Sequence, residues 1–222
     1  MTADAIGNAE IYFFMLPLFP LSLVVFPGEH VNLHIFEPRY RQLIKECVEG
    51  ETSFGITPYL EKKLQQYGTQ VRVMQVVKQY EDGRMDVTVE GLKRYRMVRF
   101  KNPVTGKLYA GAEVQFIENE PDDTTLSERL ILNEKIRELY QVLSVENEFD
   151  PEENYFSYQV GHKIGLSPAQ EYELLQIDAE SERLKFLKDH LEQAIPIVRS
   201  TERTKELIRL NGHFKNFDPL NF

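Results

Sequence analysis

The chain has 222 residues, 42% of them hydrophobic, which is enough to form either one domain or a compact body with a helical appendage. Its single cysteine, Cys47, excludes an internal disulfide and a multi-cysteine metal centre, and is in keeping with a reducing cytoplasm. The formal net charge of −9 arises from residues 119–222, with 21 acidic and 12 basic side chains, and it opposes binding to nucleic-acid phosphates.

The N-terminal region predicts neither a leader nor a membrane anchor. Residues 11–27 are as apolar as a signal peptide, but residues 1–10 contain no Lys or Arg. Pro17, Pro20 and Pro27 would also interrupt any membrane-spanning helix. We therefore expect a soluble, cytoplasmic protein with a flexible N-terminus over residues 1–10 and no membrane partner.

The same three prolines predict extended segments at the start of the fold, because proline lacks the N–H that a helix interior needs. Gly28 then permits a tight turn, and a second extended segment is expected over residues 31–36. Pro38 is suited to a first helical turn, so a helix is predicted from Pro38 to a stop at Gly50. On this helix Cys47 falls on the apolar face and is interpreted as a core residue without chemistry.

The middle of the chain is rich in short strands. Strands are predicted over residues 54–56, 69–80, 84–90, 92–100 and 108–117, with a loop around residues 62–66. Asp82-Gly83 predicts a two-residue primed hairpin turn, and Gly91 predicts a bulge. Strands this short and this closely spaced indicate a small, closed or half-closed β-barrel over residues 11–120.

After Pro121 the hydrophobic period changes from two to about 3.6, which predicts a helical subdomain over residues 121–210. Thr125 and Ser167 each begin a capping box, and a further helix is expected over residues 156–164. Asp178 is predicted to cap the last helix, with a kink or break caused by Pro196.

Several motifs carry a family resemblance. They are LPLFPL (16–21), FPG (26–28) and LHIFEPRY (33–40), then Gly68-Thr69, Asp82-Gly83-Arg84, VEGL (89–92), Arg94-Tyr95-Arg96 and the helical residues 167–198. With these motifs the chain resembles the Lon N-terminal domain, the substrate-binding module of ATP-dependent Lon proteases, and it is more similar to the stand-alone bacterial form. The resemblance implies an α+β fold in which a PUA-like small β-barrel is followed by a C-terminal α-helical bundle.

The motifs of enzymes are not found in the sequence. Gly106-Lys107 lacks the rest of a phosphate-binding loop, and neither a Gly-x-Ser-x-Gly elbow nor the ATPase and Ser-Lys protease modules of Lon are recognised. His30 and His34 would stand about 13 Å apart on a strand, too far to share a metal. We therefore expect a non-enzymatic protein with no catalytic residue, no cofactor and no metal.

The resemblance implies that the chain binds unfolded or exposed peptide segments of proteins, as an adaptor in proteolysis. Candidate contact residues are Phe36, Glu37, Arg39, Tyr40, Tyr95, Phe214 and Phe217. Glu37 and Arg39 flank Pro38, where they would serve either the strand-to-helix junction or a partner's polar groups.

Other interpretations stay open at this point. A PUA-like surface with the basic cluster of residues 93–101 and Tyr95 would bind RNA, although the acidic charge makes nucleic acid the weaker hypothesis. A structural or adaptor protein would dock on a separate protease or on another copy of itself. The apolar tail of residues 211–222 would either fold back on the barrel or occupy the peptide groove or a neighbouring subunit.

Overall fold

The computed structural model describes residues 14–118 and 120–213, which form two compact units. The β unit comprises residues 14–118 together with 167–176, and the helical unit comprises residues 120–166 and 177–213. Together they give the mixed α+β fold that the sequence predicts. The predicted flexible N-terminus of residues 1–10 and most of the aromatic tail lie outside the described residues.

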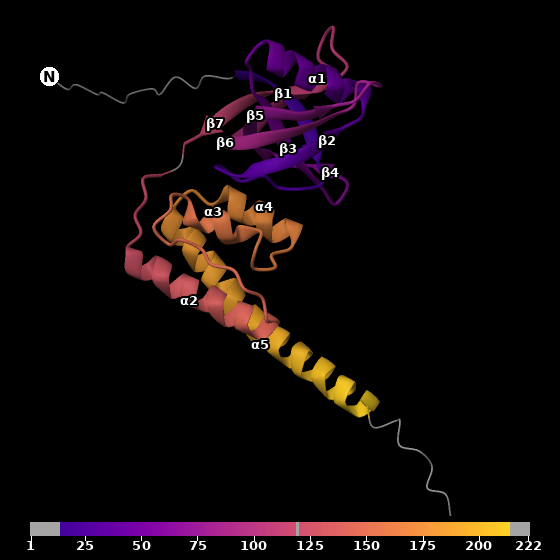
Figure 1. Cartoon of the computed structure of the whole chain (residues 1–222). Coiled ribbons are helices and arrows are strands. Elements are labelled where there is room, and N and C mark those ends of the chain that lie inside the picture. Colours follow the sequence, from indigo (N-terminus) through magenta and orange to yellow (C-terminus); the bar gives the residue numbers. More distant parts are fainter. Residues whose placement is uncertain (1–13, 119, 214–222) are drawn as a thin grey trace, which may run out of the picture. The chain divides into compact units, whose positions relative to one another are not determined.

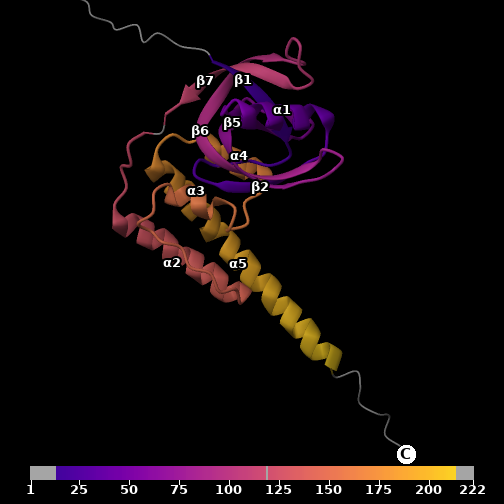
Figure 2. The ribbon, with the colours of Figure 1, turned by 45° about the horizontal axis from the view of Figure 1, so that its top comes forward.

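The β unit holds seven strands among its described residues (Figure 1): β1 (Phe14–Leu21), β2 (His30–Ile35), β3 (Phe54–Leu60), β4 (Lys63–Leu64), β5 (Tyr67–Gln79), β6 (Met85–Lys101) and β7 (Ala110–Ile117). Neighbouring strands pair antiparallel, except that β1 and β3 are parallel. Because β1 pairs with both β7 and β3, the path β1-β7-β6-β5-β3 returns to its start. The long strand β6 curves around this ring and pairs with β5, β7 and β2 (Figure 2).

Two helices belong to the β unit. Helix α1 (Pro38–Glu49) begins with proline in its first turn and ends at Gly50, as predicted. Helix α4 (Pro168–Gln176) opens with the predicted capping box at Ser167, whose hydroxyl accepts from the Gln170 backbone N–H. The sequence pattern grouped α4 with the other helices, but its contacts with β3 and β5 place it in the β unit.

The main core of the β unit fills the space between the strands and α1. Its largest side chains include Phe19, Tyr40 and Phe54, and Cys47 is buried among them, in agreement with the prediction. Burial raises the pKa of the Cys47 thiol, so it remains protonated at neutral pH.

Tyr95 lies at the centre of a second, smaller core cluster. Its ring is fully buried, and its hydroxyl is hydrogen-bonded to the Thr57 hydroxyl at 2.5 Å. A Cβ atom added to Gly55 or Gly68 would lie 2.5 Å from this phenol oxygen, so both glycines make room for the ring.

The turns are where sequence and structure differ most. The connection between β5 and β6 is not the predicted two-residue primed turn. Tyr80 and Gly83 close a β-turn by a 2.9 Å hydrogen bond, and within residues 80–84 only Gly83 has a positive φ, of 83°. Since the Tyr80 N–H also donates to the Arg84 carbonyl, the loop is a three-residue turn with a glycine bulge. The Asp82 carboxylate stabilises this turn by accepting from the Arg84 backbone N–H.

A primed turn is found instead where a loop was expected, between β3 and β4. Glu61 and Lys62 have φ values of 49° and 62°, which is the two-residue geometry that suits the twist of paired strands. Neither Glu nor Lys is typical of positive φ, so no local pattern predicted this hairpin. The predicted bulge near Gly91 is confirmed, since the register of β6 against β5 shifts between Gly91 and Arg94.

The helical unit contains α2 (Leu126–Leu143), α3 (Phe156–Gly161) and α5 (Glu180–His213). The predicted capping box at Thr125 is confirmed, with both of its reciprocal hydrogen bonds to Glu128. Asp178 is not the cap of the last helix, which begins two residues later. The Asp123 carboxylate serves this end instead, accepting from the backbone N–H and the hydroxyl of Ser181.

The predicted break at Pro196 does not occur, because α5 continues through this residue. Pro196 is exposed while Leu191 and Ile195 are buried, so the proline ring lies on the solvent side and the freed carbonyl one turn earlier can bind water. Among the residues that the structure describes, no helix is both long and apolar enough to cross a membrane.

Candidate functional site

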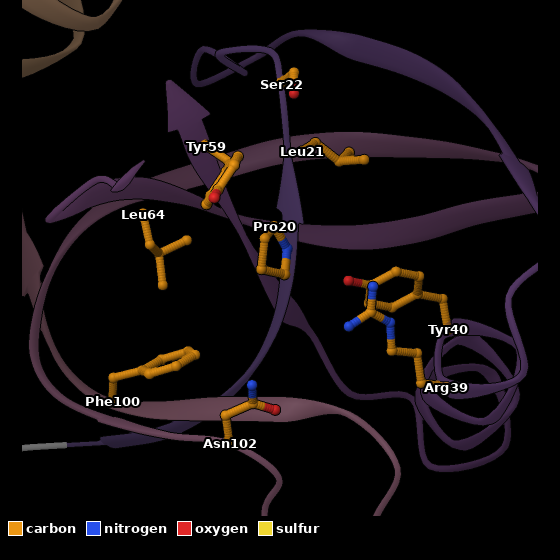
Figure 3. Close-up of a pocket in the computed structure, with 9 residues that line it drawn as sticks. All are labelled: Pro20, Leu21, Ser22, Arg39, Tyr40, Tyr59, Leu64, Phe100 and Asn102. Carbon is orange, nitrogen blue, oxygen red and sulfur yellow. The ribbon is translucent and has the colours of Figure 1, made fainter. Parts of the chain in front are cut away.

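A pocket of about 400 Å³ lies in the β unit at the end of β1 (Figure 3). Four parts of the unit line it: the end of β1, the first turn of α1, the β3-β4 hairpin and the end of β6. The lining residues are Pro20, Leu21, Ser22, Arg39, Tyr40, Tyr59, Leu64, Phe100 and Asn102. Below we call it the β1-end pocket.

Strand pairing explains why a pocket forms here. The register of β1 with β7 runs from Phe14 to Leu18, whereas its register with β3 continues from Leu18 to Leu21. The last residues of β1 therefore have a strand on one side only. Pro20 fits this position because it has no N–H to leave unpaired.

The first turn of α1 supplies the opposite wall. Since Pro38 starts the helix, Arg39 and Tyr40 are held on rigid helical backbone. The Tyr40 ring stacks on Phe19 with ring centroids 3.8 Å apart, and its hydroxyl end faces the pocket in Figure 3. Burial raises the pKa of Tyr40, so its phenol is a neutral donor and acceptor at physiological pH.

Arg39 is the one charged residue among the nine lining residues. Its Nε and Nη2 atoms lie 2.9 and 2.8 Å from Oε2 of Glu37, and its guanidinium carbon lies 4.5 Å from the centroid of the Tyr40 ring. The ion pair and the aromatic contact fix the guanidinium, although the Arg39 side chain is 47% exposed.

Apolar side chains form the rest of the pocket. Tyr59 and Phe100 are 45% and 42% exposed, and Leu21 and Leu64 are half-buried beside them. Figure 3 shows the Phe100 ring directed into the same space as Leu64. Exposed aromatic and aliphatic surface with a few oriented polar groups is the usual make-up of a ligand site, and this volume admits a short segment rather than a folded domain.

The structure brings together some of the predicted contact residues and separates others. Arg39 and Tyr40 line the pocket, and Glu37, which is not part of the lining, forms an ion pair with Arg39. Phe36 is 59% exposed and lies outside the lining. Tyr95 is fully enclosed in the core, so its ring is not at the surface, and Phe214 and Phe217 lie outside the described residues.

Sequence reasoning missed the other half of the pocket. Tyr59 and Leu64 oppose each other across the unanticipated β3-β4 hairpin. Phe100 lies near the end of β6, just before Asn102 and Pro103, and an aromatic residue next to a predicted turn was the one signal in the sequence.

A second groove, of about 770 Å³, runs between α1 and the β5-β6 hairpin of the same unit. Its apolar residues include Val48, Val76 and Leu108, and its charged residues carry both signs: Arg41, Lys45, Glu49, Glu81 and Asp82. The mixed charge gives this groove no electrostatic preference.

The basic cluster of residues 93–101 does not form a continuous cationic surface. Arg94 is buried, and its Nη1 donates to the carbonyl of Leu175 on α4. Lys93 pairs with Glu118, and both Arg99 and Lys101 lie within 4 Å of Glu113 at 3.7 and 3.4 Å. Such pairing lowers the charge available to a phosphate backbone.

Of the two histidines considered as metal ligands, His34 has a structural partner. His34 lies 2.6 Å from the Asp86 carboxylate across the β2-β6 pair. Within the described part of the chain, no group of three or more His, Cys, Asp or Glu residues is arranged to hold a metal ion.

The fold is that of a small α+β module with an open pocket at the end of β1. The family described as the substrate-binding domain of the ATP-dependent protease La (LON) matches residues 15–193, so the chain belongs to this family.

Two solved structures are similar over most of the chain. A Lon N-terminal domain protein from Xanthomonas campestris is 29% identical with a TM-score of 0.64, and the match covers 79% of this chain and 98% of that one. The N-terminal domain of the Mycobacterium avium complex Lon protease is 20% identical with a TM-score of 0.58, covers 81% and 98%, and supports the fold alone.

Proposed function

We propose that this chain is a non-enzymatic module that holds exposed or unfolded polypeptide segments in the β1-end pocket. The observation that carries the proposal is an open apolar pocket whose lining includes Pro20, Leu21, Arg39 and Tyr40, which come from the segments 16–21 and 33–40 that carry the family resemblance. A motif that only stabilised the fold would have no need to leave apolar surface open at this point.

The chemistry of the pocket fits a polypeptide ligand. Phe100, Leu64 and Tyr59 offer contact area for an apolar side chain, and the hydroxyls of Tyr40 and Ser22 offer donors and acceptors for peptide groups. Affinity from apolar area with few directional bonds is tolerant of sequence, as a module for many unfolded clients requires.

The proposal also covers the type of barrel, the source and location of the protein, and its partner protease. We infer that the closed path of strands is a PUA-like small barrel, that the protein is bacterial and cytoplasmic, and that it presents bound segments to a separate protease. The β1-β3 pairing that closes the path supports the first inference. Co-purification of a protease with the tagged chain, lost when the chain's own fold is disrupted, is the measurement that checks the last.

Fluorescence anisotropy with labelled peptides from unfolded proteins tests the binding function. Saturable binding is expected, and Phe100→Ser is expected to weaken it about tenfold, because burial of an aromatic side chain contributes roughly 1.5 kcal/mol or more. Leu108→Ser, in the second groove, is the matched control and leaves the affinity unchanged. Loss of binding in the control alone would move the site to the second groove, and no saturable binding by the unmodified chain would refute the function.

A further inference from the structure

We propose that the β1-end pocket selects polypeptide segments in which an apolar side chain is next to a carboxylate, and that Arg39 is the residue that recognises the carboxylate. This inference rests on the proposed function and specifies its ligand. The carboxylate is an Asp or Glu side chain of the client segment, and the free C-terminus of a chain, which presents the same planar acceptor to a guanidinium, is distinguished by the last test.

The charge of the pocket is the first argument. Eight of the nine lining residues are neutral, and the ninth is Arg39. A ligand group that enters the pocket therefore meets one cation and no lining anion. The second groove, whose lining carries both signs, has no such complementarity and offers a contrast within the same unit.

The orientation of Arg39 is the second argument. Arg39 contacts Glu37 through Nε and Nη2, and a guanidinium has five N–H donors in a rigid fork. The guanidinium lies over the Tyr40 ring, and in Figure 3 its terminal nitrogens and the Tyr40 hydroxyl are both on the side of the ring that faces Pro20. A carboxylate placed there would accept from the guanidinium and from the neutral Tyr40 phenol together.

The opposite wall of the pocket is the third argument, because it offers apolar contacts to the side chain next to the carboxylate. Leu64 and Phe100 face the same space from the β3-β4 hairpin and the end of β6. The pocket has a volume of about 400 Å³. One short peptide can fill this volume by burying an apolar side chain against Leu64 and Phe100 while the neighbouring carboxylate contacts Arg39.

Glu37 acts as an internal competitor for the ligand. Its carboxylate already occupies one edge of the guanidinium, which holds Arg39 in place and reduces the charge that a ligand meets. Glu37 is the N-cap residue of α1, but its side chain makes no capping hydrogen bond. Its replacement therefore leaves the helix end intact, which makes Glu37→Gln a clean test of competition.

Three labelled peptides, identical except for Asp, Asn or Lys after a central Phe, test the inference by fluorescence anisotropy at low salt. The Asp peptide is expected to bind about threefold to fivefold more tightly than the Asn peptide, the range for a half-exposed ion pair, and the Lys peptide more weakly than both. Added salt should reduce the ratio toward one.

Variants assign the preference to a residue. Arg39→Gln is expected to bring the Asp-to-Asn ratio of affinities close to one, and Glu37→Gln is expected to increase it. Arg72→Gln is the matched control, because Arg72 is an exposed arginine of the same unit that pairs with Glu90 outside the pocket, and its ratio should equal that of the unmodified chain. Far-UV circular dichroism verifies that each variant is folded.

The outcomes separate the two proposals. If no peptide binds saturably, the binding function itself fails. If all three peptides bind with equal affinity, if the Lys peptide binds best, or if Arg39→Gln keeps the ratio, carboxylate recognition is overturned while the binding function stands. A fourth peptide ending in Phe, as a free carboxylate or as an amide, identifies the source: preference for the free end assigns the pocket to chain termini, and preference for internal Asp alone assigns it to acidic side chains.

Discussion

A buried ion pair in the helical unit gives the strongest stability prediction. The Glu180 carboxylate accepts from the backbone N–H and hydroxyl of Ser157 at 2.9 and 2.7 Å, and from Nη2 of Arg183 at 2.7 Å. Arg183 also donates to the carbonyls of Ile177 and Asp178, both at 2.8 Å. These bonds join the start of α5 to α3 and to the chain just before α5.

The cost of breaking this pair follows from its burial. The side chain of Arg183 is only 2% exposed, so Glu180→Ala would leave a buried cation without its counter-charge. Removing one partner of a buried pair costs about 3–5 kcal/mol, a large share of the roughly 5–15 kcal/mol that stabilises a typical domain. Glu180→Gln keeps the shape and one acceptor oxygen, and we expect it to cost less than the alanine variant.

Guanidinium titration followed by far-UV circular dichroism is the suitable assay, since the chain has no tryptophan and the signal reports the helices. A double variant, Glu180→Gln with Arg183→Met, completes a thermodynamic cycle and is expected to be less destabilised than the sum of the single variants. A loss below about 1 kcal/mol for Glu180→Ala would refute the reasoning, because it would mean that Arg183 is solvated in the folded protein.

Three further predictions concern the turns, caps and charges of the fold. Gly91→Ala is expected to lower the free energy of unfolding by about 1–3 kcal/mol, measured by denaturant titration, because the added Cβ would lie 2.1 Å from the carbonyl oxygen of Phe26. Thr125→Ala is expected to cost about 1 kcal/mol in the same assay through loss of the capping box. A hydrogen bond from Lys107, and a smaller contribution from Tyr109, hold the pKa of Glu46 below its usual value of 4.5. The stability that Glu46 contributes should therefore be complete above pH 4.5 and be lost as the pH falls through the folded-state pKa. Glu46→Gln is expected to show a smaller loss of stability in acid.

Each of these predictions has a control that shares its chemistry. Gly106→Ala meets no described atom within 4 Å and carries only the cost of a φ of 75°, so it should be milder than the change at Gly91. Ser127→Ala removes an exposed hydroxyl from the same helical turn as Thr125 and should be nearly neutral. Glu49→Gln removes a carboxylate of the same helix that lies 3.8 Å from Lys45 and outside the Lys107 and Tyr109 contacts, so it is the control for the loss of one helix carboxylate. Equal effects in a variant and its control would contradict the corresponding explanation.

Local patterns determined the elements of this protein. The prolines of residues 16–40 predicted extended segments and the start of α1, and the capping boxes at Thr125 and Ser167 predicted the starts of two helices. The single cysteine on an apolar helix face was correctly placed in the core. These predictions are correct because each depends on backbone geometry or on spacing within a few residues.

The tertiary structure alone decided which residues meet. The primed turn at Glu61 and Lys62 has no local signature, yet it places Leu64 opposite Tyr59 and so completes the pocket. The alternation of strand residues likewise gave no sign that Tyr95 would be enclosed, because its burial depends on space left by glycines on other strands.

Sequence patterns therefore predicted the class of fold, the family motifs and the residue types present at the start of α1. Only the folded chain decided that Arg39 and Tyr40 face Phe100 and Leu64 across one pocket, and that most of the basic side chains between residues 93 and 101 are paired or buried. The physical reason is that a helix or strand is specified by neighbours along the chain, whereas a binding site is specified by contacts between segments many residues apart.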